Sequence, residues 1–111
     1  MQKTYYLYIL ASQRQVLYVG MTSNIEQRTF QHKTHAFGGF TAQYNVTNLM
    51  YFERYREALK AIRREKEIKS WRREKKIELI ESANPTWRDL SYGWSQRHQF
   101  QPERKISSDQ P

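Results

Sequence analysis

The chain has 111 residues and no cysteine, and hydrophobic residues make up 38% of it, aromatic residues 14%. This length fits a single domain, and the apolar content excludes wholesale disorder. The lack of cysteine excludes disulfides, thiolate zinc sites and a cysteine nucleophile. The longest apolar run, residues 5–11, is too short to span a bilayer, and no signal segment opens the chain. We therefore expect a cytoplasmic protein with no membrane partner.

The charge is strongly basic and unevenly distributed. Nineteen Lys and Arg residues against eleven Asp and Glu residues give a formal net charge of +8, which favours a polyanionic partner such as nucleic acid. Residues 54–76 hold eleven bases and four acids, a net of +7. Evenly spread bases would indicate a solvated helix face, whereas this clustering favours contact with phosphate. The residues that we expect to contact the phosphates of a nucleic acid are Arg63, Arg64, Lys69, Arg72 and Arg73.

The first half of the chain predicts a β-hairpin followed by a helix. Residues 4–11 and 16–20 are rich in tyrosine and branched aliphatics and flank a polar turn. The first strand is apolar on both faces, so we expect helices above and below the sheet. Ser23 and Glu26 have the spacing of a capping box, which predicts a helix over residues 24–35. Gly38 and Gly39 then break the chain.

The second half predicts one strand, two helices and a tail. Residues 48–55 form the strand, and residues 57–69 and 71–82 the helices. A closing segment with Trp87, Leu90, Tyr92 and Trp94 should pack on the body. The sequence thus predicts an α+β fold with the order β-β-α-β-α-α, in which a three-stranded sheet is flanked by helices. The domain spans residues 1–94, and residues 95–111 form a polar, disordered tail.

One acid lies on an apolar helix stripe. At about 100° per residue, Glu65 falls within the same arc as Ala61 and Ile68. A desolvated carboxylate needs a cation partner, a raised pKa or a metal. On an isolated helix, an ion pair with Lys69, four residues on, is the favoured explanation, and metal binding is the alternative.

Two weaker patterns involve donors and a glycine. Arg28, His32 and His35 should project from nearly the same helix face, where they could grip a phosphate or form an ordinary polar surface. Gly20 ends a hairpin rich in tyrosine and precedes a helix start. It could admit an anion to the backbone or belong to an ordinary turn. Tyr8 and Tyr18 on this hairpin could equally be core residues with a polar tip.

Taken in order, these features resemble the GIY-YIG nuclease family, in its small single-domain bacterial branch, which is related to the nuclease domain of the DNA-repair excinuclease. The resemblance covers residues 4–94. It departs from the family pattern at Tyr6, which replaces the name-giving glycine, and at Val19, which replaces isoleucine. Met21 stands where related nucleases often carry a basic residue. The matching motifs are Tyr6-Leu7-Tyr8, Tyr18-Val19-Gly20, Arg28 with His32, Arg64-Glu65-Lys66, Asn84, and the strings over residues 40–45 and 84–90.

The resemblance implies a divalent-metal-dependent endonuclease that hydrolyses phosphodiester bonds in DNA or RNA. It makes Glu65 the single protein ligand of one Mg²⁺ or Mn²⁺ ion, with water and substrate oxygens completing the shell. Arg28 matches the arginine that stabilises the phosphate. Tyr18, with Tyr8 beside it, is the candidate to orient or deprotonate the attacking water.

Two further residues take roles from the resemblance. His32 would share proton transfer or bind phosphate, and Asn84 would hold the site together by hydrogen bonding, although a turn residue before a proline is an equal explanation. We expect a structure- or single-strand-directed enzyme linked to DNA repair or recombination. The alternative is a nucleic acid-binding module with weak or no catalysis, which Met21 favours. The sequence leaves substrate preference and oligomeric state open.

Overall fold

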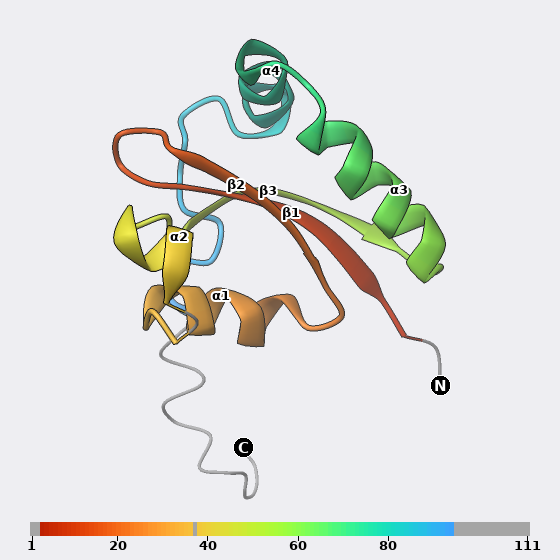
Figure 1. Ribbon diagram of the computed structural model, residues 1–111, viewed down its shortest axis with the longest axis horizontal. Helices are drawn as coiled ribbons and strands as arrows, with labels where there is room; N and C mark the ends of the chain where they lie inside the picture. Colours follow the sequence, from red (N-terminus) through yellow and green to blue (C-terminus); the bar gives the residue numbers. More distant parts are fainter. Residues whose placement is uncertain (1–2, 37, 95–111) are drawn as a thin grey trace, which may run out of the picture.

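The computed structural model describes residues 3–36 and 38–94, and Figure 1 shows a sheet with helices on both sides. The α+β class and the predicted order are confirmed, with one five-residue helix added that begins at the second residue of the glycine pair. The elements are β1 (Tyr5–Ala11), β2 (Leu17–Thr22), α1 (Ile25–Lys33), α2 (Gly39–Gln43), β3 (Asn48–Tyr55), α3 (Ala58–Lys69) and α4 (Arg73–Ala83).

The sheet is antiparallel with the order β2-β1-β3, so β1 lies in the middle. Successive residues of a strand face opposite sides. Leu7 and Ile9 therefore pack with Ile68 of α3 and other residues on one face. Tyr8 and Leu10 pack on the other face. Helices α3 and α4 cover the first face, and α1 and α2 lie on the second (Figure 1). The apolar character of β1 on both faces correctly predicted this arrangement.

Helix α1 begins one residue later than the capping-box prediction. Its N-cap is Asn24, whose Oδ1 accepts a hydrogen bond from the backbone N–H of Gln27 at 3.0 Å. Thr22 Oγ1 in turn accepts from the N–H of Asn24 at 3.1 Å. Ser23 therefore does not cap the helix, and the prediction was wrong. The observed register buries Ile25, the first helical residue, against the sheet.

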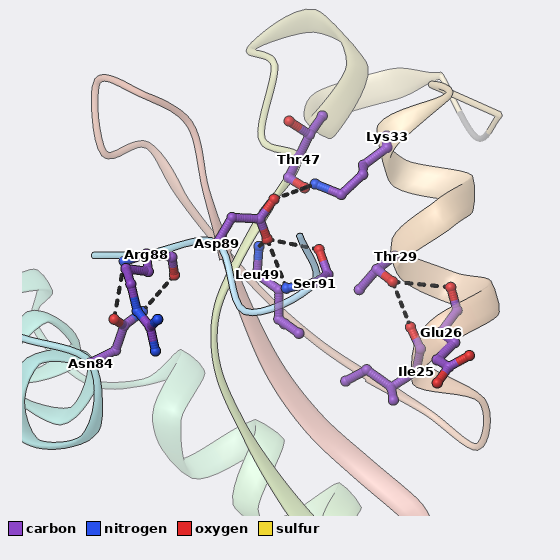
Figure 2. A network of polar contacts seen from close by, with 10 residues as sticks. All are labelled: Ile25, Glu26, Thr29, Lys33, Thr47, Leu49, Asn84, Arg88, Asp89 and Ser91. Carbon is purple, nitrogen blue, oxygen red and sulfur yellow. Dashed lines mark hydrogen bonds and ion pairs between the residues drawn. The ribbon is translucent and has the colours of Figure 1, made fainter. Parts of the chain in front are cut away.

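A carboxylate secures the closing segment. Asp89 accepts hydrogen bonds from the backbone N–H of Leu49 in β3 at 3.0 Å and from Ser91. Its other oxygen lies 2.6 Å from Nζ of Lys33 in α1, as Figure 2 shows. The segment thus joins β3 to α1. Burial opposes ionisation of Asp89, but hydrogen bonds from Lys33 and Ser91 outweigh it and hold the pKa of this carboxyl below its usual value.

The aromatic residues of the closing segment divide into two groups. Trp87 packs on the α3 side of the sheet, and Leu90 and Trp94 pack on the α1 side, as expected. Tyr92 is 88% exposed, so its predicted packing was wrong. The predicted tail over residues 95–111 lies outside the described residues. Among residues 3–36 and 38–94, no helix is long and apolar enough to cross a membrane.

Candidate active site

The site is built around a close approach between Tyr8 and Gly20. The two residues are paired across β1 and β2, and the side chain of Tyr8 packs on the α1 side of the sheet. A Cβ atom on Gly20 would lie 2.6 Å from both Cζ and Oη of Tyr8 and 3.0 Å from a ring carbon of Tyr18. Glycine is therefore required here because the Tyr8 ring crosses directly over its Cα atom. Anion binding at Gly20 stays a prediction.

The hydroxyl of Tyr8 leads into a short chain of polar contacts. Its oxygen lies 3.2 Å from Nε2 of His32, and Nδ1 of His32 lies 3.1 Å from Oγ1 of Thr41. Burial, and secondarily the charge of Arg28, lower the pKa of His32 to about 4, so the ring is neutral near pH 7. With the proton on Nδ1, His32 accepts from Tyr8 and donates to Thr41. A neutral ring with both nitrogens engaged supports proton handling or positioning rather than charge pairing with a phosphate.

Tyr18, Arg28 and His32 line an open cavity of about 250 Å³. Its other lining residues are Gly38, Phe40 and Thr41. Tyr18 and Arg28 are both half-buried. The ring centroids of Tyr18 and His32 lie 5.6 Å apart. The cavity therefore presents a phenol and a guanidinium together, a combination suited to a phosphate and a water.

Burial distinguishes the two tyrosines. Burial raises the pKa of Tyr8 to about 12, Tyr18 adds to the rise, and the hydrogen bond and charge of Arg28 oppose it. Glu65 makes a further small contribution in the same direction as burial. Tyr8 is fully buried and stays a phenol at neutral pH. Tyr18, which lines the cavity, is the tyrosine that a substrate can reach.

Glu65 lies on the sheet-facing stripe of α3, as the sequence predicted. It stands between Ala61 and Ile68, both fully buried, and its side chain is 21% exposed. Its Oε2 lies 3.0 Å from Nζ of Lys69, so the ion pair predicted for an isolated helix is present. Its charge also acts on Tyr8. The carboxylate thus has both the expected lysine partner and an electrostatic connection to Tyr8.

The donor set near Glu65 is compatible with one kind of metal site. No group of three or more His, Cys, Asp or Glu side chains in the described part of the chain could enclose a metal. A single accessible carboxylate oxygen fits a hard divalent cation that keeps most of its water, as Mg²⁺ does. The residues present therefore fit the predicted cofactor with Glu65 as its protein ligand, and Lys69 would have to release part of its contact.

Asn84 holds backbone groups of β3 and of the segment after α4. It caps the end of α4, on the opposite side of the sheet from α1, as Figures 1 and 2 show. Its Nδ2 donates to the carbonyls of Met50 at 3.1 Å and Arg88 at 2.8 Å, and its Oδ1 accepts from the N–H of Arg88 at 3.0 Å. These bonds fix the turn after α4 against β3. The structure supports the alternative explanation of Asn84 as a turn residue.

His35 does not share a helix face with Arg28 and His32, so that prediction was wrong. Helix α1 ends at Lys33, and His35 adopts a left-handed backbone with φ of 59°. The N–H of His35 donates to the carbonyl of His32, and that of Ala36 to the carbonyl of Gln31. This pattern closes the helix as a Schellman motif. The helix therefore ends before His35, whose side chain is exposed.

The predicted basic residues have different environments. The guanidinium of Arg64 forms a forked pair with Glu53 of β3, with N–O distances of 3.0 to 3.3 Å, and also contacts Glu67. Its charge is therefore paired within the fold, and its contact with nucleic acid stays a prediction. Lys69 is paired with Glu65. The remaining members of the set are exposed and available for phosphate contact: Arg63, Arg72 and Arg73.

Sequence reasoning missed the cavity wall and the network around Glu53. Thr41 completes the contacts of His32, but nothing in the motif indicates that hydrogen bond. Tyr51 and Tyr55 both donate to Glu53. Burial would raise the pKa of Glu53, but hydrogen bonds from Arg64 and these tyrosines hold it below its usual value. Tyr51, Glu53 and Tyr55 alternate along β3 and so lie on one face of the strand, and this spacing could have predicted the network.

The sequence is similar to those of a known protein family. A family model described as the GIY-YIG catalytic domain matches residues 4–78. UPF0213 proteins of Haloquadratum walsbyi and Clostridium perfringens are each 35% identical to the chain, over 83 and 79 residues. These alignments cover 75% and 71% of this chain and 93% and 85% of those proteins.

A solved structure shows the same fold. The solution NMR structure of the UPF0213 protein BH0048 from Bacillus halodurans matches with a TM-score of 0.52, over 81% of this chain and 97% of that chain, at 22% identity. Since the family model spans more than half of the sequence and the UPF0213 relatives align over most of their length, the chain belongs to the GIY-YIG nuclease family, in its small single-domain branch.

Proposed function

We propose that the protein is a divalent-metal-dependent endonuclease that hydrolyses phosphodiester bonds in DNA, directed to branched or single-stranded structures and linked to repair or recombination. The observation that carries the proposal is the cavity in which Tyr18 and Arg28 lie beside the Tyr8–His32 pair. The electrostatic connection of Glu65 to Tyr8 supports it. The net charge of +8 is consistent with a nucleic acid substrate.

Hydrolysis joins a water oxygen to phosphorus while a bond from phosphorus to a sugar oxygen breaks. Arg28, a permanently charged fork, binds the phosphoryl oxygens and offsets the negative charge that develops on them. Tyr18 holds the attacking water, since it is the tyrosine that lines the cavity. Tyr8 and neutral His32 act as positioning residues that fix the Tyr18 ring and the Arg28 guanidinium.

Glu65 is the residue that would hold the cation. When bound, Mg²⁺ or Mn²⁺ supplies Lewis acidity at a phosphoryl oxygen. Glu65 itself presents a carboxylate oxygen that is anchored on a rigid helix between two buried residues, which limits its rotamers. Exposed bases on α3 and the start of α4, such as Arg63 and Arg73, would contact the flanking backbone phosphates.

A nicking assay on supercoiled plasmid tests the proposal. The protein should cut with Mg²⁺ or Mn²⁺ and not with EDTA. Arg28→Lys should slow cutting by at least about tenfold, because lysine keeps the charge and loses the fork. Arg63→Lys, a matched change at an exposed arginine, should have little effect. Equal cutting in EDTA, or full activity of Arg28→Lys, would contradict the proposal.

A second candidate is a nucleic acid-binding module with little catalysis. The ion pair between Lys69 and Glu65 favours it, because the proposed metal ligand already has a cation partner, and so does Met21 at a position where a base would be expected. This candidate predicts salt-sensitive binding to DNA without cutting in any metal.

A further inference from the structure

Two exposed aromatic rings, one on α2 and one at its C-cap, have no explanation in the fold. Phe40 and Tyr44 lie four residues apart, hence on one face of the short helix. Their centroids are 4.9 Å apart with an interplanar angle of 48°. Each residue is 48% exposed, and neither belongs to the two hydrophobic clusters of the described residues. Large apolar rings exposed side by side are unusual on a surface and often mark a binding site.

The position of the pair connects it with the candidate active site. Phe40, near the start of α2, lines the cavity of about 250 Å³ together with Tyr18 and Arg28. Tyr44, just past the end of α2, lines a neighbouring hollow of about 580 Å³ beside the β1–β2 turn. The two rings thus connect the catalytic cavity to a second surface depression.

The chemistry of the second hollow suits a polyanion with exposed bases. Its lining contains Arg14 and is rich in carboxamides and hydroxyls, which can donate and accept hydrogen bonds. None of the described residues lining either hollow is an acid, and each hollow has one arginine. The carboxamides that line the second hollow are Gln13, Gln43, Asn45 and Asn48.

We propose that Phe40 and Tyr44 form a stacking platform for an unpaired nucleobase, next to the phosphate held by Arg28. This inference rests on the proposed nuclease function and specifies its substrate contact. Bases stack readily on exposed aromatic rings when they are free of a duplex. The strand then continues into the carboxamide-lined hollow. The platform therefore selects a single-stranded or splayed segment at the site of cutting.

Binding without cleavage tests the platform directly. In EDTA, fluorescence anisotropy would compare a short oligothymidylate with an abasic oligonucleotide of the same length, which keeps the phosphates and lacks the bases. The wild-type protein should prefer the oligothymidylate by about 5- to 150-fold, the range expected for stacking of one base. The double variant Phe40→Ala with Tyr44→Ala should lose this preference and bind both probes like the abasic one.

Matched variants control for folding and for unspecific loss of aromatic surface. Tyr44→Phe keeps the ring and should keep the preference. Tyr92→Ala removes a more exposed tyrosine that lines neither hollow and should change nothing. All variants should melt near the wild-type temperature, because both α2 rings are half-exposed.

The outcomes separate the platform from the nuclease function. Equal binding of the two probes by the wild type would overturn the platform, and so would an unchanged preference in the double variant. Metal-dependent nicking in either case would leave the proposed function standing. Absence of both binding and nicking would overturn the two together.

Discussion

The substitution Gly20→Ala tests the construction of the site more sharply than removal of any polar group. The added methyl would lie 2.6 Å from Cζ and Oη of Tyr8, about 1 Å inside the usual carbon–carbon separation. Tyr8 is fully buried, so its ring has little room to retreat. The hydroxyl must shift, and with it the 3.2 Å contact to His32.

The expected cost follows from three effects. Overpacking a buried position costs about 1–3 kcal/mol, and loss of the Tyr8–His32 hydrogen bond adds about 1 kcal/mol. Replacing a glycine in a strand by alanine stabilises the fold by about 0.5–1 kcal/mol, because the unfolded chain loses conformational freedom. We expect a net loss of about 1–3 kcal/mol in the free energy of unfolding, which lowers the melting temperature by about 5–20 °C for a domain of this size. Cleavage should fall in parallel, because Tyr18 is also displaced.

Urea unfolding in a double-mutant cycle with Tyr8→Leu isolates the contact. In the leucine background the methyl has space, so Gly20→Ala should cost less by at least about 0.5 kcal/mol. Gly39→Ala is the control: its φ of 68° makes it costly, but no atom lies within 4 Å of the added methyl, so its cost should be equal in both backgrounds. Equal costs for Gly20→Ala in the two backgrounds would refute the reasoning.

Three further predictions concern pH and polar pairs. His32 stays neutral in the folded protein down to pH about 4, whereas the unfolded chain protonates it below about pH 6.5. Its contribution to the free energy of unfolding is therefore complete above pH 6.5. This contribution falls by up to about 3 kcal/mol as the pH drops toward 4. In urea titrations, His32→Gln should therefore show a weaker dependence of stability on pH than the wild type. An unchanged pH dependence would contradict the role of His32. Arg64→Gln should lower the free energy of unfolding by about 1–3 kcal/mol. This is less than for a fully buried ion pair, because the pair of Arg64 with Glu53 is partly exposed. Arg63→Gln should instead leave the melting temperature unchanged, weaken DNA binding and reduce the salt dependence of binding by about one phosphate contact. Thermal melting and DNA binding across a salt series measure both variants. A loss of stability in Arg63→Gln but not in Arg64→Gln would be inconsistent with the ion pair between Arg64 and Glu53. Asn84→Ala should cost about 2–3 kcal/mol through lost buried hydrogen bonds with unchanged cleavage per folded molecule; a selective loss of cleavage would restore its catalytic assignment.

The features that could be predicted from sequence are those fixed by local periodicity. The apolar character of β1 on both faces required cover on both sides of the sheet. The position of Glu65 between Ala61 and Ile68 required a partly buried carboxylate, because helical geometry leaves little freedom once the stripe is known. Residues 48–55 also matched β3 at both ends.

The features that could not be predicted depend on contacts between distant segments. Arg63 and Arg64 are adjacent and identical, and only the approach of Glu53 from β3 separates a surface base from a structural one. The need for Gly20 appears only when the pairing of β1 and β2 places the Tyr8 ring over it.

Local exceptions account for the remaining errors. Non-glycine His35 takes the left-handed position that ends α1, so no glycine marks the helix end. Helix α2 is only five residues long, and its N-cap and first residue are both glycines. Periodicity is not visible over so short a segment.

The role of Glu65 is central to the proposed hydrolysis, and one paired measurement tests it. Glu65→Gln keeps the size of the side chain and removes its charge. We predict that this variant binds a DNA substrate in EDTA within about threefold of the wild-type affinity, as expected when few phosphate contacts change, and shows no Mg²⁺- or Mn²⁺-dependent nicking. Nicking by Glu65→Gln at the wild-type rate would contradict the central claim.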